Sequence, residues 1–263
     1  MHRWSEISVW IGVHRLAVKP GCAKRHDRLR LSWWATGNSA LQNLSLSQQA
    51  YDRLEALIVT TDLAPGARTT LGELERLSGF GRTPVHDAVK RLSTARLVHV
   101  QPRSGLRIAP LDLEEERLLL PVRIEMEAIA CKLAAQRADA DHIAQLSAAA
   151  ETLRTGRDGM TLAEFNLVDS ELNAIILAAS GEMMLGNTLQ PLQTLYRRSG
   201  WLFQTFVAPD GAIADIVTAH LDLLDIIISR DPVAAEHMVR AMLSEVYSSL
   251  QKLQKFKIAE RYV

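Results

Sequence analysis

The segment from residue 50 to residue 110 constrains the fold most, because the period of its apolar pattern changes partway along. Apolar residues first recur at three- and four-residue spacing in three short stretches, which predicts three helices. Turn-forming residues at 64–66 and 79–81 separate these helices. Two β-rich runs then flank a turn at 101–105, which predicts a hairpin. The order helix, helix, turn, helix, hairpin is that of a winged helix-turn-helix.

The remainder of the chain has a helical apolar pattern throughout. It predicts helices near residues 113–137, 140–156, 161–179, 183–206, 211–229 and 232–257. Asp139, Thr161 and Asp231 are expected as N-caps, and Pro191 is expected to kink the fourth of these helices. The predicted fold class is therefore mainly α, with an N-terminal winged helix-turn-helix and an all-α helical-bundle domain.

Charge is distributed unevenly along the 263 residues, although the formal net charge is zero. Residues 1–43 carry a net charge of +5 and no sustained periodicity, so we expect a flexible basic extension. Residues 44–112 carry +2 and residues 113–263 carry −7, so a polyanion is expected to bind the front half. The two cysteines are too few for a disulfide framework, and no apolar run is long enough to span a bilayer. We therefore expect a cytoplasmic protein without a membrane partner.

The third predicted helix carries the residues expected to read DNA. In a helix-turn-helix the second helix of the motif places its first residues in the major groove, where a guanidinium can contact guanine bidentately. Arg82 is the strongest candidate for that contact, and residues one and two turns later share its face. The hairpin tip could reach the adjacent minor groove or its phosphates. The candidate DNA-binding residues are Arg82, Thr83, His86, Lys90, Arg103, Ser104 and Gly105.

Three motifs in this segment resemble the GntR family of bacterial regulators. They are Gly79–Leu92, which is similar to the family's recognition-helix signature, and Arg96–Val100 with Pro102–Gly105, which match its wing. The resemblance implies a homodimer on a palindromic operator. It also places Arg82, Thr83 and Gly105 at positions that the family uses against DNA. His86 and Gly72 stand where the family usually has arginine, which predicts an operator that differs from the common one.

The helical second half resembles the FadR-type subgroup, whose C-terminal domain is called FCD. The matching residues include 122–127, 169–173 and 219–220. Many such domains hold a divalent metal with Asp and three His. Here Asp169 and His220 match, whereas Asn173 and Met242 occupy the other two positions and are weak ligands. We therefore expect no metal and no cofactor. Arg123, which the resemblance places near the ligand, is a natural anchor for a carboxylate.

These observations predict a regulator of transcription, either repressor or activator, controlled by a small-molecule effector. The effector is expected to be an organic acid held by Arg123, Asp169, Asn173, His220 and Met242. No nucleophile elbow, phosphate-binding glycine loop or complete metal triad supports catalysis, so no enzyme activity is expected. Two alternatives remain open: a metal-dependent enzyme that uses Asp169 and His220, or a helical module that binds protein. Met183, Met184, Trp201 and Phe203 are expected in the core.

Overall fold

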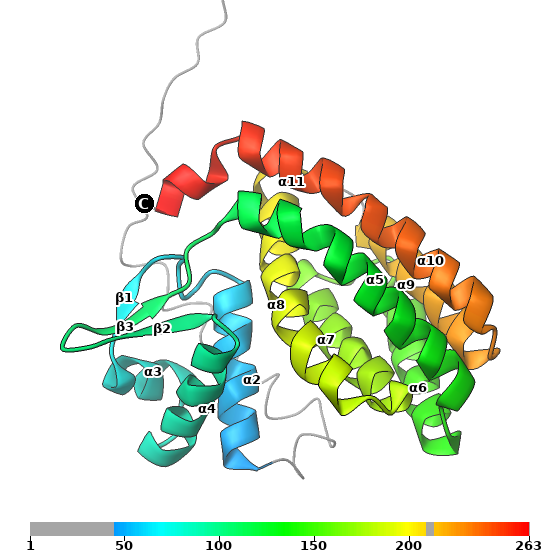
Figure 1. The fold of residues 1–263 in the computed structure, drawn as a ribbon, viewed down its shortest axis with the longest axis horizontal. Helices are drawn as coiled ribbons and strands as arrows, with labels where there is room; N and C mark the ends of the chain where they lie inside the picture. The colour runs from blue at the N-terminus through cyan, green and yellow to red at the C-terminus, as the bar shows by residue number, and fades with distance from the viewer. Residues whose placement is uncertain (1–44, 209–212, 263) are drawn as a thin grey trace, which may run out of the picture. The chain divides into compact units, whose positions relative to one another are not determined.

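The computed structural model describes residues 45–208 and 213–262, which form one compact unit. The predicted basic extension of residues 1–43 lies outside the described residues. The predicted order of the elements is observed, with helices and strands in the first part and helices alone in the second (Figure 1). No described helix is long and apolar enough to cross a membrane.

The first part of the described chain is a winged helix-turn-helix, as the sequence predicts. Three helices come from the three apolar stretches, and Ser45 and Thr70 cap the first two through their side chains. The predicted hairpin forms and is joined by a two-residue strand, β1, in a sheet of order β1-β3-β2. Two residues are too short to show a period of two, so sequence reasoning missed β1. The elements are α2 (Leu46–Val59), β1 (Arg68–Thr69), α3 (Leu71–Ser78), α4 (Arg82–Thr94), β2 (Val98–Gln101) and β3 (Gly105–Ile108).

The second part is all helical. Thr161 makes a capping box with Glu164, and Asp139 and Asp231 cap their helices as predicted. Helices α5 and α10 pack side by side, as do α5 and α7 (Figure 1). The elements are α5 (Leu113–Arg137), α6 (Ala140–Gly156), α7 (Leu162–Ser180), α8 (Met183–Phe206), α9 (Ile213–Ile228), α10 (Pro232–Ser244), α11 (Val246–Lys255) and the 3₁₀ helix η2 (Ile258–Tyr262).

The last predicted helix, 232–257, is divided in two, so its prediction as one helix is wrong. Glu245 ends α10 and precedes α11. At this join the Ser244 hydroxyl donates to the carbonyl oxygen of Ala241 at 2.7 Å. A serine side chain that bonds locally competes with the backbone ladder, which gives the division a physical reason.

Of the four residues expected in the core, two are partly buried and two are exposed. Trp201 and Phe203 are partly buried. Met183 and Met184, by contrast, are 80% and 76% exposed, so their assignment to the core is wrong. They form the first turn of α8, where the helix has not yet entered the bundle.

Candidate DNA-reading surface and effector cavity

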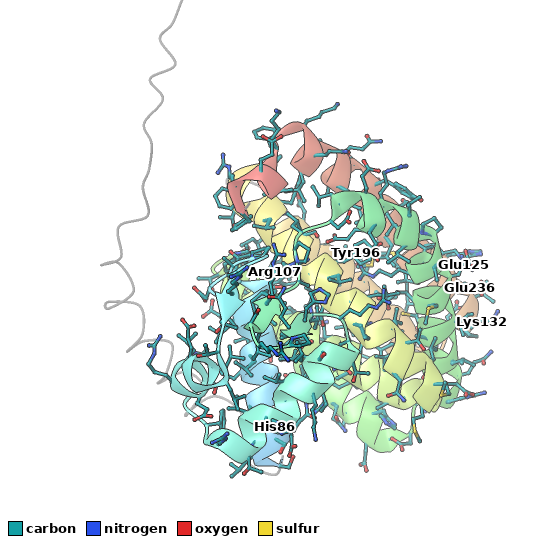
Figure 2. The ribbon with its side chains drawn as sticks, turned by 60° about the vertical axis from the view of Figure 1, so that its left-hand side comes forward. His86, Arg107, Glu125, Lys132, Tyr196 and Glu236 are labelled. Carbon is teal, nitrogen blue, oxygen red and sulfur yellow. The ribbon has the colours of Figure 1, made fainter. Side chains whose placement is uncertain are left out.

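One face of α4 is buried and the opposite face is open to solvent. Val85, Ala88, Val89 and Leu92 pack into the core of the winged helix-turn-helix. Arg82, Thr83, His86 and Lys90 are all exposed. Arg82, His86 and Lys90 are four residues apart, so they follow one another along one side of the helix. His86 lies at the surface, and its ring nitrogen is 3.9 Å from the carboxylate of Asp87 (Figure 2).

The start of α4 carries positive charge from two sources. Its N-cap is Gly81, which makes no side-chain capping bond, so the first backbone N–H groups of the helix are not satisfied by a cap. Such a helix terminus favours anions, and Arg82 adds a full charge at the same place. This arrangement suits a phosphate or the acceptor edge of a base.

The wing places Arg103, Ser104 and Gly105 at its exposed tip. The backbone N–H of Ser104 donates to the carbonyl of Gln101 at 3.0 Å, which closes the turn. Gly105 has φ +85°, and a Cβ there would lie 3.0 Å from the carbonyl oxygen of Thr69. Glycine is therefore required for β3 to approach β1 at this point.

All five predicted effector residues line a single cavity of about 50 Å³ in the helical part. Arg123 comes from α5, Asp169 and Asn173 from α7, His220 from α9 and Met242 from α10. A site for one water needs about 10–15 Å³ of such space, so the cavity holds only a few waters or a small polar group. The structure thus brings together every residue that the sequence singled out here.

The guanidinium of Arg123 already has close partners. Its Nε lies 3.2 Å from a carboxylate oxygen of Glu127, as the i,i+4 spacing allows, and it stacks over the ring of Tyr196 at 4.6 Å. The amide of Gln193 donates to both oxygens of Glu127 at 3.2 Å. Burial raises the pKa of Glu127, which the charge of Arg123 opposes. A ligand carboxylate on Arg123 must therefore compete with Glu127.

Asp169, which is buried, pairs with the partly buried His220, and Nε2 of His220 lies 3.3 Å from Oδ1 of Asp169. The other ring nitrogen, Nδ1, lies 2.8 Å from the carbonyl oxygen of Ile216 and must carry a hydrogen to bond it. Burial lowers the pKa of His220, but the hydrogen bond and charge of Asp169 outweigh it and raise that pKa above its usual value. Conversely, burial raises the pKa of Asp169, but His220 holds it below its usual value.

The donor set fits a resident metal ion poorly. Across residues 45–208 and 213–262 no group of three or more His, Cys, Asp or Glu side chains is placed to hold one. Asn173 donates its amide to Asp169 at 3.3 Å, and Nε2 of His220 is paired with the same carboxylate.

Sequence reasoning missed a second set of buried polar residues, where α2 meets α8. Arg197 pairs with Glu55 at 2.8 Å, and the Thr194 hydroxyl donates to the same carboxylate. Sequence spacing held a usable signal, because Glu55 lies one turn after the buried Tyr51 and next to the buried Leu54. A charge at an inward helical position requires a partner.

A third buried set, at the start of α5, ties the segment after the wing to α8. Arg198 donates to the carbonyl oxygens of Ala109 and Pro110 at 2.8 and 2.9 Å. Its charge lies 3.9 Å from Glu116, whose other carboxylate oxygen accepts from the Ser199 hydroxyl. Burial raises the pKa of Glu116 to about 7, despite these partners.

Comparison with known proteins assigns both parts of the chain. Residues 46–108 match the family described as bacterial regulatory proteins, gntR family, and residues 118–245 match the FCD domain. A regulator from Agrobacterium vitis, described as an uncharacterized HTH-type transcriptional regulator, is 30% identical over 139 residues, 51% of this chain and 80% of its own length. One from Streptomyces ambofaciens is 25% identical and covers 78% of this chain and 84% of its own length.

Solved structures show the same fold. McbR/YncC of E. coli superposes with a TM-score of 0.67 at 19% identity, covering 80% of this chain and 99% of its own. A putative GntR regulator from Rhodococcus sp. RHA1 gives a TM-score of 0.56 at 15% identity, covering 78% and 97%. The matched families and relatives are regulators, not enzymes, which excludes the enzyme alternative. The chain is a transcriptional regulator that belongs to the GntR family and carries an FCD domain behind its winged helix-turn-helix.

Proposed function

We propose that this regulator binds a specific operator as a homodimer and that a small organic acid controls its affinity for DNA. The main support for operator binding is the exposed face of α4. Arg82, Thr83, His86 and Lys90 are open to solvent although the opposite face of the same helix is buried. The exposed wing tip at 103–105 supplies a second contact in the same part of the chain.

Arg82 is assigned to a base edge, and Lys90 and Arg103 are assigned to phosphates. A bidentate arginine–guanine pair discriminates against the wrong base by about 1–3 kcal/mol, whereas a phosphate contact weakens binding uniformly and lowers the salt dependence. Arg82→Ala should therefore lose sequence discrimination, and Lys90→Ala should lose affinity for all duplexes alike. Fluorescence anisotropy with the DNA upstream of the gene and a scrambled duplex, at two salt concentrations, separates the two effects.

Homodimer formation is supported by the family and by an uncovered stripe on α5. Leu118, Val122 and Ile129 are 68%, 51% and 48% exposed, and their spacing places them along one side of the helix. A second copy that covers this stripe would remove apolar surface from water and would set the distance between two α4 helices. Molar mass from sedimentation equilibrium, compared with that of Val122→Asp, tests this assignment.

The effector part rests on the polar cavity around Arg123, Asp169, Asn173, His220 and Met242. A carboxylate there would exchange with Glu127 on Arg123, and we propose that it does so without a metal ion, because the four residues at the metal position fit one poorly. A ligand at 100 times its dissociation constant stabilises the folded state by about 2.7 kcal/mol. A thermal-shift screen of organic acids and divalent metals tests both points: a largest shift with zinc or nickel would contradict the second.

A further inference from the structure

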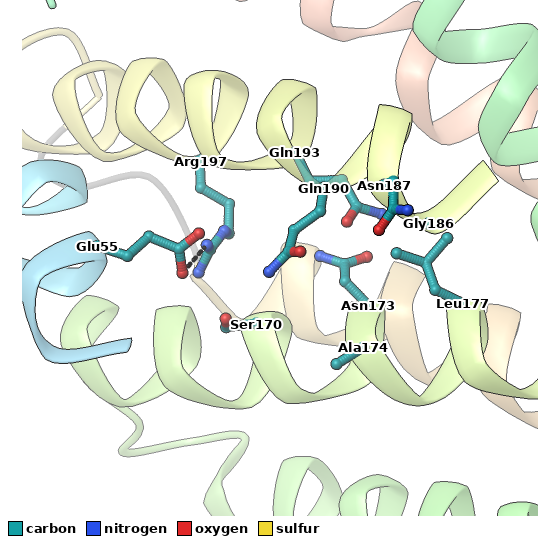
Figure 3. Close-up of a pocket in the computed structure, with 10 residues that line it drawn as sticks. All are labelled: Glu55, Ser170, Asn173, Ala174, Leu177, Gly186, Asn187, Gln190, Gln193 and Arg197. Carbon is teal, nitrogen blue, oxygen red and sulfur yellow. Dashed lines mark ion pairs between the residues drawn. The ribbon is translucent and has the colours of Figure 1, made fainter. Parts of the chain in front are cut away.

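A second and larger cavity lies beside the first. It has a volume of about 220 Å³, and Asn173 lines both cavities. Its lining comes from α7, α8 and α2, and α2 belongs to the DNA-binding part (Figure 3). Compared with the roughly 10–15 Å³ that one water needs, this space accommodates a small organic molecule.

Glu55 and Arg197 are the two charged residues in the lining and lie at one end of the cavity (Figure 3). Nη2 of Arg197 lies 2.8 Å from a carboxylate oxygen of Glu55. The neighbouring donor, Nε of Arg197, is buried without a hydrogen-bond partner among the described residues. A buried guanidinium nitrogen that lacks a partner is costly, so Arg197 retains an unmet demand for an acceptor.

The geometry of the guanidinium defines what would satisfy that demand. Nε and one terminal nitrogen form a planar fork that a carboxylate matches with two parallel hydrogen bonds. Glu55 meets only one side of this fork. A ligand carboxylate that takes both nitrogens must displace the Glu55 oxygen from Nη2.

The rest of the lining specifies the body of the ligand. Ser170, Asn173 and Gln190 offer hydroxyl and amide groups, which both donate and accept, and they carry no charge. Leu177 and Gly186 lie at the end away from Arg197 (Figure 3). A short molecule with one carboxylate at the arginine end and neutral hydroxyl groups along its body meets these partners.

Glu55 connects the cavity to the recognition helix. Its carboxylate also receives the Thr194 hydroxyl, and the Tyr51 hydroxyl lies 3.5 Å from it. Arg91 of α4 stacks over the ring of Tyr51 at 4.1 Å. Displacing Glu55 therefore removes a buried ion pair between α8 and α2, and Tyr51 is the one residue between Glu55 and Arg91 of α4.

We propose that this cavity binds a small hydroxycarboxylate through Arg197, and that the ligand competes with Glu55 for the guanidinium and so detaches α2 from α8. The consequence for DNA affinity rests on the proposed function, whereas ligand binding at Arg197 does not. The site is distinct from that around Arg123, which does not line this cavity and whose Nε already donates to Glu127.

Competition predicts that replacing Glu55 and replacing Arg197 have opposite effects on ligand binding. Isothermal titration of the full chain with glycerate, which has one carboxylate and two hydroxyl groups, and with glyceramide as the uncharged control, measures these effects. Glycerate should bind the wild type and glyceramide should not. Glu55→Gln removes the competing charge and should tighten glycerate binding about tenfold or more, a factor that corresponds to about 1.4 kcal/mol. Arg197→Met should abolish it.

Two further variants keep the test decisive. Arg197→Met leaves Glu55 buried and unpaired, which can unfold the chain, whereas the double variant Glu55→Gln/Arg197→Met removes both charges and is milder. The double variant should fold and fail to bind glycerate. Arg154→Met, which removes an exposed arginine of α6, should bind glycerate like the wild type.

The proposal is overturned if glycerate fails to bind both the wild type and Glu55→Gln, or if it binds the double variant undiminished. Weaker binding of glycerate to Glu55→Gln would also overturn it, because removing a group that competes for Arg197 cannot weaken the binding of the ligand to Arg197. Operator binding is measured on the same samples. A protein that binds operator but not glycerate refutes this inference alone, and one that binds glycerate through Arg197 but no operator refutes the proposed function alone.

Discussion

Replacing Glu116 with glutamine removes a carboxyl group that the fold buries at the start of α5. Burial raises the pKa of this group from 4.5 to about 7, against the opposing Ser199 hydrogen bond and the charge of Arg198. A group whose pKa is raised on folding stabilises the folded state fully below its unfolded-state pKa, and this contribution is lost as pH rises through the folded-state pKa. At about 1.4 kcal/mol for each pH unit, Glu116 should lower the free energy of unfolding by about 3 kcal/mol between pH 4.5 and pH 8.

Urea unfolding of the wild type and of Glu116→Gln, at intervals between pH 4.5 and pH 8, measures this contribution. The difference in unfolding free energy between the two proteins should change by about 3 kcal/mol across the range, in favour of the variant at high pH. Glu115→Gln, an exposed neighbour on the same helix, should run parallel to the wild type. A constant difference between wild type and Glu116→Gln would refute the reasoning, because it would mean that Glu116 titrates normally in the folded protein.

Three further predictions follow from the cavity and the wing. His220→Gln should destabilise the protein most between about pH 3.8 and 6.5, where both charges of the pair with Asp169 are present. The loss of stability should become smaller as pH rises, because the raised pKa of His220 supplies stability that is lost on deprotonation. A difference in unfolding free energy that is the same at all pH values would contradict this. Gly105→Ala should lower the free energy of unfolding by about 1–2 kcal/mol, because the φ of +85° is left-handed and the added Cβ meets the Thr69 carbonyl. Gly72→Ala, which has open space around it in a helix, should be neutral or stabilising. Equal melting temperatures for the two variants would refute the need for glycine at position 105. Dialysis against a chelator should leave the melting temperature unchanged, and a fall that zinc restores would show that Asp169 and His220 hold a metal.

The fold was largely predictable because its signals are local. Apolar spacing places the helices, and cap residues such as Asp139 and Thr161 mark their starts. Predictions were less successful where tertiary contacts decide the outcome. Strand β1 exists only because β3 pairs with it. The division of the last predicted helix at Glu245 is a different case, because the Ser244 bond beside it is local and a serine at such a position does not by itself end a helix. Exposure of Met183 and Met184 depends on where α8 enters the bundle, which residue type does not specify.

The grouping of the five candidate effector residues was predictable only through the resemblance to the FCD domain. Arg123, Asp169, Asn173, His220 and Met242 come from four helices, and apolar periodicity alone could not have brought them to one cavity. The pair of Glu55 and Arg197 is a different case. The position of Glu55 on the inward side of its helix indicates that it needs a partner, but Arg197 lies far away in the sequence and spacing cannot identify it.

Whether α4 reads DNA through Arg82 is tested most directly by the affinities of three proteins for two duplexes. Anisotropy titrations should compare wild type and Arg82→Ala on the upstream DNA and on a scrambled duplex at one salt concentration, with Arg154→Ala as the control arginine. Wild type and Arg154→Ala should prefer the upstream DNA, and Arg82→Ala should bind both duplexes alike while keeping the wild-type melting temperature. Undiminished preference in a folded Arg82→Ala would contradict the assignment of α4 as the reading helix.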